Sequence, residues 1–280
     1  MTAELPAALG GTHFGATLRS FVRYPYYHAQ VTEPLILEQL REWGVDISSG
    51  GLHALITEGK ERFHREKDAI LRVGLRISGY IHADDTGARH KGKNGYTTHI
   101  GNEWFAWFET THSKSRIHFL ELLRAGPTDY VLRGEALEYM VAQKLPQEPL
   151  AKLAGAIDRS FADRTQWQAA LQEWGITDER HIQIATEGAL IGSVLDHGVH
   201  RDLVIVSDDA GQFDVLRHAL CWIHAERLLA KLVGFNDAQR EALEPVRSAV
   251  WPLYRDLKTY QAEPTAQARQ ELEARFDTLC

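Results

Sequence analysis

Two apolar runs, far apart in the chain, each end in a pair of aspartates followed by a turn. The first run, "RISGYIHAD", alternates in polarity and reaches Asp84. The second, "DLVIVSDD", has the pattern of a short buried strand and reaches Asp208. A strand end fixes the position of a carboxylate, so neighbouring strands of one sheet would bring Asp84 and Asp208 together. The pattern therefore favours a fold in which both runs lie in one sheet.

Paired carboxylates repel each other unless a cation lies between them, and hard oxygen ligands suit Mg²⁺ or Mn²⁺. Two such ions about 3.5 to 4 Å apart are the usual means of activating a water or hydroxyl in phosphodiester cleavage. The pattern predicts a phosphoryl-transfer site with Asp84 and Asp208 as metal ligands. Asp-Asp-Thr-Gly and Asp-Asp-Ala-Gly are also ordinary turn sequences, which is the alternative interpretation.

The strand and helix patterns predict an α/β fold. More narrowly, they predict an α+β arrangement in which a mixed sheet is interrupted by a helical insertion. Residues 76–111 predict three strands, with Asp84 at the exit of the first and Gly101-Asn102 as a two-residue hairpin loop. Residues 126–200 predict the helical insertion, and residues 202–208 predict a further strand. These parts form an expected core over 76–235, and residues 236–280 predict the start of a second, C-terminal helical insertion.

The N-terminal part predicts two helices joined by a tight turn. "TEPLILEQLREWG" has Thr32 as its N-cap and Gly44 as its stop, and Ser48 or Ser49 caps the second helix. This is the layout of a helix-turn-helix, whose second helix enters a DNA major groove. An ordinary helical hairpin is the alternative. Residues 1–75 are thus expected to form a helical, helix-turn-helix-like DNA-binding region.

The charge balance restricts how the chain could bind DNA. A net charge of -7 and a pI of about 6.1 argue against a surface that is basic throughout, so any nucleic-acid contact is expected to be local. Basic residues do gather around the first aspartate pair, although a solvated surface is the simpler explanation of such a run. The candidate DNA contacts are Arg89, Lys91, Lys93, Lys114 and Arg116.

The length and composition favour a soluble globular protein. The chain has 280 residues, 44% of them hydrophobic, enough for about two domains. No stretch approaches the roughly 18 to 20 apolar residues of a membrane helix, and the N-terminus lacks the pattern of a secretory signal. Two cysteines, Cys221 and Cys280, are too few for a disulfide framework. A cytoplasmic protein is expected.

Several motifs, in order along the chain, resemble a known family. They are "HADDTGAR", "NGYTTHIGNEWFAWFETTHSKSRIHFLELL", "VIVSDDAGQF" and "HALCWIHAER", preceded by the leader "GTHFGATLRSFVRYPYYHAQVTEPLILEQLREWGVDIS". Together they resemble the DDE transposases of bacterial insertion sequences, closest to the insertion-sequence-sixty-six type. The resemblance covers nearly all of the chain. It implies an RNase H-like core with a mixed five-stranded sheet, interrupted by insertions, whose acidic residues bind two divalent ions.

The resemblance assigns the first two acids of the family to this chain. The first falls on Asp84 and the second on Asp208, with Asp85 and Asp209 as the alternatives at each pair. Cys221 and His224 match a C-x-x-H element found after the second aspartate in several transposase groups, and on a helix they would share one face. A zinc site would need further ligands at a suitable spacing, so packing or DNA contact is the other interpretation of this pair.

The third acid of the family, a glutamate in an Asn-rich setting, has no clear counterpart here. Glu226 comes too soon after Asp208, and Glu241 and Glu244 lie where the expected C-terminal insertion begins. The chain is therefore expected to be a transposase cut short at its C-terminus.

The resulting expectation is a transposase that cleaves DNA and transfers strands of an insertion sequence, dependent on Mg²⁺ or Mn²⁺ and active as a homo-oligomer on DNA in the bacterial nucleoid. The resemblance implies hydrolysis of the phosphodiester at the element end, followed by attack of the freed 3′-hydroxyl on target DNA. One alternative is a catalytically inactive DNA-binding regulator derived from a transposase. Another is an unrelated Mg²⁺-dependent phosphohydrolase with Asp84 as nucleophile, although "HADDTG" lacks its D-x-D-x-T arrangement.

Overall fold

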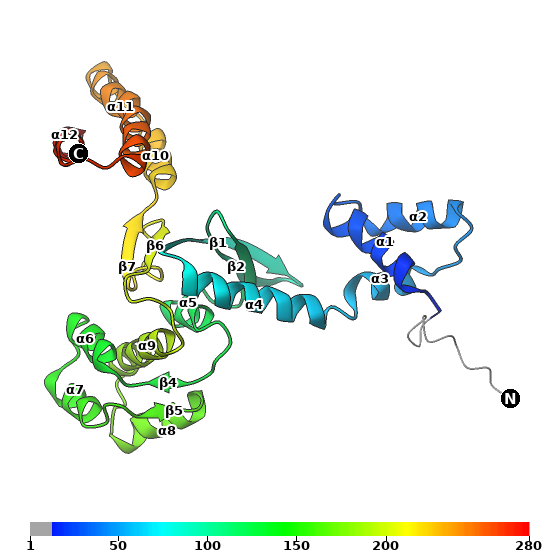
Figure 1. The fold of residues 1–280 in the computed structure, drawn as a ribbon, viewed down its shortest axis with the longest axis horizontal. Helices are drawn as coiled ribbons and strands as arrows, with labels where there is room; N and C mark the ends of the chain where they lie inside the picture. The colour runs from blue at the N-terminus through cyan, green and yellow to red at the C-terminus, as the bar shows by residue number, and fades with distance from the viewer. Residues whose placement is uncertain (1–12, 280) are drawn as a thin grey trace. The chain divides into compact units, whose positions relative to one another are not determined.

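The computed structural model describes residues 13–279, which divide into two units after Lys67, inside helix α4 (Figure 1). Residues 1–12, which make up most of the N-terminal stretch that lacks the pattern of a secretory signal, lie outside the described part of the chain. Cys280 lies outside it too. Among the described helices, none has the length and apolar character needed to cross a bilayer. The domain boundaries expected at residues 75 and 235 stay predictions.

The first unit is helical. Its core is a single cluster of apolar side chains contributed by three helices and the turn between the second and third. The helices are α1 (Ala16–Tyr27), α2 (Glu33–Glu42) and α3 (Ser49–Thr57), followed by the first residues of α4 (Glu61–Ile77). The buried residues are Val22, Ile36, Leu40, Ile47, Leu52, Leu55 and Ile56.

The two helices predicted from their caps are confirmed. Thr32 is the N-cap of α2, and Gly44 follows the helix with a φ of +75°, where glycine is favoured. Ser48 is the N-cap of α3, and its hydroxyl accepts a hydrogen bond of 3.0 Å from the backbone N–H of Gly51. Helix α1, which comes before them, was not predicted.

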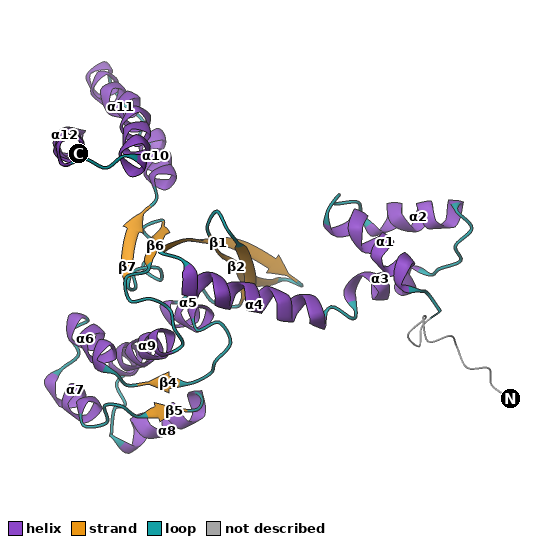
Figure 2. Ribbon diagram, in the orientation of Figure 1, coloured by secondary structure: helices purple, strands orange, loops and turns teal. Residues whose placement is uncertain are grey.

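The second unit is built on a mixed five-stranded sheet in the order β3-β2-β1-β6-β7, drawn in orange in Figure 2. Its strands are β1 (Tyr80–His90), β2 (Lys93–Gly101), β3 (Ala106–Thr111), β6 (Val204–Ser207) and β7 (Arg217–Leu220). Strands β1 to β3 form an antiparallel meander, whereas β6 runs parallel to β1, and β7 runs parallel to β6. The expected mixed sheet, with strands in 76–111 and 202–208, is confirmed.

The predicted end of the first strand at Asp84 is wrong. Strand β1 continues to His90, because residues beyond Asp84 pair with the first half of β2 down to the pair His90–Lys93. The hairpin turns at Lys91 and Gly92, with φ of +49° and +78°, values that two-residue hairpin loops favour. Asp84 therefore lies in the middle of a strand and is paired with His99 of β2, whereas the pairing of β1 with β6 ends at His82.

Two other local predictions fail in the same region. The loop between β2 and β3 has four residues, 102–105, and not two, because Gly101 pairs directly with Ala106. Residues 217–220, for which no strand was predicted, form the edge strand β7. Both cases are decided by pairing with a neighbouring strand, which local sequence patterns do not reveal.

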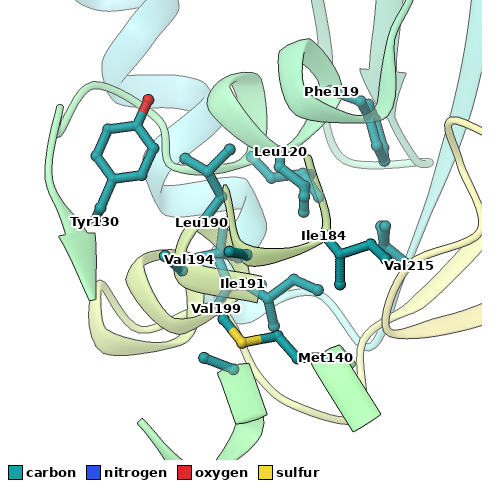
Figure 3. Close-up of a cluster of buried hydrophobic side chains, with 14 of the residues drawn as sticks. Phe119, Leu120, Tyr130, Met140, Ile184, Leu190, Ile191, Val194, Val199 and Val215 are labelled. Atoms are coloured by element: carbon teal, nitrogen blue, oxygen red, sulfur yellow. The ribbon is translucent and has the colours of Figure 1, made fainter. Parts of the chain in front are cut away.

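The helical insertion between the antiparallel and parallel parts of the sheet is confirmed. It follows α5 (Arg116–Leu123) and contains α6 (Gly134–Ala142), α7 (Gln147–Ala154), α8 (Arg164–Glu173), α9 (Glu179–Asp196) and a small antiparallel pair, β4 (Tyr130–Val131) with β5 (Ser160–Phe161). Helix α9 is buried from Ile184 to Val194. Its side chains pack in one apolar core with those of α5 (Figure 3). The same core includes Ile81, Ala83 and Ile100 on the inner face of the sheet.

Helix α9 approaches its neighbours closely through glycines. At Gly192 an added Cβ would lie 2.1 Å from the carbonyl oxygen of Val131, and at Gly188 it would lie 2.8 Å from that of Ala136. Backbone oxygens held in other elements cannot move aside cheaply. Glycine at these two positions is therefore required for the packing of α9 on β4 and α6.

Gly192→Ala is expected to destabilise the second unit by about 1 to 3 kcal/mol, since overpacking forces backbone shifts of this cost. Gly134→Ala is the matched control, because a Cβ there meets nothing within 4 Å. Thermal unfolding followed by circular dichroism measures both. Equal melting temperatures for the two variants would contradict the close approach of α9 to β4.

Three helices follow the sheet: α10 (Trp222–Lys231), α11 (Asp237–Ala262) and α12 (Ala266–Leu279). The helical character expected for residues 236–280 is confirmed. Aromatic edge contacts join Trp222 to Tyr254 and Phe276, with ring centroids 6.1 and 6.4 Å apart. These contacts link α10 to the two helices that come after it.

Candidate metal-binding site

Asp84 and Asp208 follow the last paired residues of two neighbouring parallel strands by the same number of positions. The last Cα pair of the ladder between β1 and β6 joins His82 to Val206. Two residues further along each strand come Asp84, within β1, and Asp208, directly after β6. Neighbouring strands are about 4.8 Å apart, so continuing this register by two residues would set the two aspartates opposite each other. The assignment of Asp84 and Asp208 as metal ligands stays a prediction.

Asp84 belongs to the sheet face that points away from the main core. Side chains alternate along a strand, and Ala83 is buried while Asp84 is exposed. Its direct partner on β2 is His99. Burial, and next the nearby His82, lower the pKa of His99, whereas Asp84 acts to raise it. His99 is therefore neutral near pH 7 and does not neutralise the carboxylate opposite.

Backbone N–H groups orient both carboxylates. The N–H of Asp85 donates to Oδ1 of Asp84 at 2.9 Å, and the N–H of Ala210 donates to Oδ1 of Asp208 at 3.2 Å. The second bond is the local turn predicted from the Asp-Asp-Ala-Gly sequence. Each carboxylate is thus positioned through one oxygen, which leaves the other oxygen available to a cation.

Asp85 has a different role from Asp84. Its Oδ1 accepts a hydrogen bond of 2.6 Å from the Thr98 hydroxyl, and its Oδ2 accepts one of 3.0 Å from Nε2 of Gln212. Both oxygens are therefore used in joining β1 to β2 and to the loop after β6. Asp209 is exposed on that loop. Between the members of each aspartate pair, the structure favours Asp84 and Asp208 as the site residues.

Arg116 holds the loop that carries Asp208. From the start of α5 its guanidinium donates to the carbonyl oxygen of Gly211, at 3.0 Å from Nε and 2.5 Å from Nη2. Its Nη1 donates to the Tyr139 hydroxyl at 3.0 Å and lies 3.5 Å from Oε2 of Glu187. The Arg116 side chain is 19% exposed, so it is a partly buried group that positions the loop.

Glu187 is a buried acid in the helical insertion. Its side chain is only 2% exposed, and it accepts hydrogen bonds from Tyr139 at 2.5 Å and from Gln183 at 2.9 Å. Burial, and next the bond to Glu187, raise the pKa of Tyr139, so this hydroxyl stays protonated and donates. Arg116 supplies the opposite charge. The group is a satisfied buried network that joins the insertion to the Asp208 loop.

The other candidate DNA contacts lie away from the aspartate pair. Arg89, Lys91 and Lys93 surround the exposed tip of the hairpin between β1 and β2. Arg89 is roughly 16 Å along the strand from Asp84, at about 3.3 Å per residue. Lys114 is exposed and lies 5.4 Å from the ring centroid of Tyr96. These residues form a basic region beside the site and not within it.

Cys221 is the N-cap of α10 and His224 lies in its first turn, so the predicted pair spans the start of this helix. The N–H of Cys221 donates to the carbonyl oxygen of Ser207 at 2.8 Å, which fixes the end of β7 beside the end of β6. Nδ1 of His224 is buried without a hydrogen-bond partner. Within residues 13–279, no three His, Cys, Asp or Glu side chains group closely enough to hold a metal ion by themselves.

A hollow of about 600 Å³ lies on the sheet face that carries Asp84. Tyr80, His82 and Val206 line it from the strands, and Trp222 and Tyr254 line it from helices α10 and α11. His82 and His99 on this face, like Gln212 and Glu187 behind it, were not found from the sequence. The alternation of polarity along β1 could have indicated His82, but the others depend on which strands and helices become neighbours.

The comparison with known proteins found a relative of undescribed activity. The chain is 42% identical over 209 residues to the uncharacterized protein y4jO of Sinorhizobium fredii (strain NBRC 101917 / NGR234). The aligned region is 74% of this chain and 65% of that protein, so the chain spans about two thirds of its relative. No family model and no solved structure matches the chain.

Proposed function

We propose that the chain is a metal-dependent DNA phosphoryl transferase of the DDE transposase type. Its site consists of Asp84 and Asp208, with DNA as substrate and Mg²⁺ or Mn²⁺ as the ion. The observation that supports the proposal is the register of β1 and β6: each aspartate comes two residues after the last Cα pair of that ladder, His82 with Val206. Two ordinary turn aspartates have no reason to occupy the same level of one sheet.

The sheet supports this proposal. A meander of three antiparallel strands, a helical insertion and two further parallel strands give a mixed five-stranded sheet interrupted by an insertion. This agrees with the RNase H-like core that the sequence resemblance implies. The insertion lies between the strands of the two aspartates, as expected.

The first unit supports DNA binding by the same protein. Helices α2 and α3 are capped and joined by a short connection over residues 43–48, which fits a helix-turn-helix with α3 as the helix that contacts DNA. In this proposal the basic hairpin tip at Arg89, Lys91 and Lys93, together with Lys114, contacts phosphates of the bound DNA at a distance from the aspartates. Arg116 acts indirectly, because it fixes the Asp208 loop.

The donor set fits a hard divalent cation. Magnesium is usually bound through one or two carboxylates, with waters and substrate phosphates completing its shell. Asp84 and Asp208 supply two such carboxylates from fixed backbone positions, and the neutral His99 leaves their charge uncompensated. When bound, the ion would supply charge stabilisation to the phosphoryl group. The chain's own part is to hold and orient the two carboxylates through the N–H groups of Asp85 and Ala210.

The proposal is tested on the full chain with supercoiled plasmid DNA. We expect conversion to the nicked form in Mg²⁺ or Mn²⁺ and no conversion when EDTA removes the ion, because phosphodiester cleavage would depend on the cation held by the aspartates. Direct Mn²⁺ binding, measured by electron paramagnetic resonance, should be present in the wild type and weaker in Asp208→Asn.

The two measurements separate the alternatives. Absence of Mn²⁺ binding would overturn the metal site. Binding of Mn²⁺ and DNA without nicking in any divalent cation would instead support the catalytically inactive DNA-binding regulator. Nicking that persists in EDTA would show a metal-independent activity and contradict the proposal.

A further inference from the structure

A groove on the first unit carries a set of side chains that the metal site does not use. It has a volume of about 540 Å³ and lies between the end of α1 and the start of α4. We call it the aromatic groove. Its lining residues are Arg23, Tyr24, Tyr27, His28, Lys60, Phe63, His64 and Lys67.

The helical period creates this groove. Lys60, Phe63, His64 and Lys67 are spaced three, four and seven residues apart, so they lie on one face at the start of α4. The α1 residues come from the last turn of that helix and its C-cap. Each helix thus contributes one stripe of mixed aromatic and basic side chains, and the stripes face a common space.

Three aromatic rings line the groove while remaining exposed. Tyr24 is 65% exposed, Tyr27 is 50% exposed and Phe63 is 56% exposed. Tyr24 is stacked against His28 with ring centroids 4.8 Å apart, and the Tyr27 hydroxyl donates to the carbonyl oxygen of Ile56 at 3.0 Å. The Arg23 guanidinium lies 5.9 Å from the ring centroid of Phe63, and Nζ of Lys60 lies 5.0 Å from that of Tyr27. Rings that are oriented in this way and still half or more exposed form a surface on which a planar group can stack.

The charged residues of the groove are all cationic: Arg23, Lys60 and Lys67, accompanied by two histidines. Arg23 donates to the carbonyl oxygens of Leu55 and Glu58, and Lys60 donates to the Tyr27 hydroxyl. The acceptors of Arg23 and Lys60 are neutral and do not cancel the positive charge of these two side chains. In a chain with a net charge of -7, such a concentration of cations indicates an anionic ligand.

We propose that the aromatic groove binds single-stranded DNA, with bases stacked on Tyr24 and Phe63 and phosphates near Arg23, Lys60 and Lys67. Stacking rings combined with a positively charged groove are how proteins hold unpaired strands without reading their sequence. A duplex hides its base faces, so it would leave the rings without partners. The inference rests on the first unit alone and does not require the metal site.

The test is fluorescence anisotropy with the full chain and a short fluorescein-labelled oligothymidylate, in EDTA. We expect the single strand to bind more tightly than a duplex of equal length, and its affinity to fall with added salt. The double variant Tyr24→Ala/Phe63→Ala should weaken binding about tenfold or more, given the energy of stacking per base. An oligouridylate of equal length tests whether RNA is preferred.

Phe235→Ala is the matched control, because Phe235 is 89% exposed and lies outside the groove. Its affinity should equal that of the wild type, whereas Phe63→Ala alone should already weaken binding. Duplex or RNA bound as tightly as single-stranded DNA, or equal effects of Phe63→Ala and Phe235→Ala, would overturn the inference. Because the assay contains no metal, failure of the proposed nuclease activity would leave its outcome unchanged, and Asp84→Asn should bind the oligonucleotide normally.

Discussion

Replacing Asp84 or Asp208 by asparagine is expected to lower the rate of Mg²⁺-dependent DNA nicking by a factor of about 10³ or more. A bound metal ion contributes several kcal/mol to stabilising charge in a phosphoryl transition state, and about 1.4 kcal/mol corresponds to tenfold in rate. Asparagine keeps the size of the side chain but removes the negative charge that holds the ion. The measurement is the initial rate of plasmid nicking in excess Mg²⁺.

Asp209→Asn is the control for this prediction. Asp209 follows Asp208 in the chain and is exposed, but it is one residue beyond the position that the β1–β6 register relates to Asp84. Its substitution should leave the nicking rate close to that of the wild type. Asp85→Asn is expected to have an intermediate effect, because its carboxylate joins Thr98 to Gln212 and so supports the loop. Nicking that survives Asp84→Asn, or is lost equally in Asp209→Asn, would refute the assignment.

Arg116→Met is expected to lower the free energy of unfolding of the second unit by about 3 kcal/mol, since removing one partner of a buried pair leaves an uncompensated charge. The charge left behind is that of Glu187, whose side chain is 2% exposed. The same change removes two hydrogen bonds to the carbonyl oxygen of Gly211. Urea unfolding, followed by circular dichroism, measures the loss.

A second substitution shows whether the buried charge of Glu187 causes the loss of stability in Arg116→Met. Glu187→Gln added to Arg116→Met removes the charge and keeps a polar side chain, so the double variant should recover part of the lost stability. Arg227→Met, at an exposed position on α10, is the matched control and should change stability little. If Arg116→Met and Arg227→Met unfold at the same urea concentration, Glu187 is not stabilised by Arg116.

The strands that carry the aspartates could be predicted from the sequence because each has a short, apolar pattern. The position of Asp84 within its strand could not, because residues 86–90 contain glycine and charged side chains and owe their extended form to pairing with β2. The same holds for β7, whose four residues lie at the edge of the sheet and were not predicted as a strand. Helix caps such as Ser48, which act within a few residues, were predicted correctly.

In the candidate site, too, some features could be predicted from the sequence and others could not. The side-by-side placement of Asp84 and Asp208 was expected, and the strand register supports it. Arg116 was expected at the DNA-facing surface, because a basic residue at the start of a helix usually lies in solvent. Its true partners, Gly211 and Glu187, are distant in the sequence and become its neighbours only when α5, α9 and the loop after β6 pack together.

A single guanidinium, that of Arg116, contacts both the helical insertion and the loop of Asp208. In evolutionary terms, this makes the insertion a part of the core that cannot be exchanged independently. A lineage that lost or replaced α9 would have to find another support for the Gly211 carbonyl and another partner for Arg116. We therefore expect the insertion and the second aspartate loop to be inherited together, with substitutions at residues 116, 139 and 187 occurring in concert.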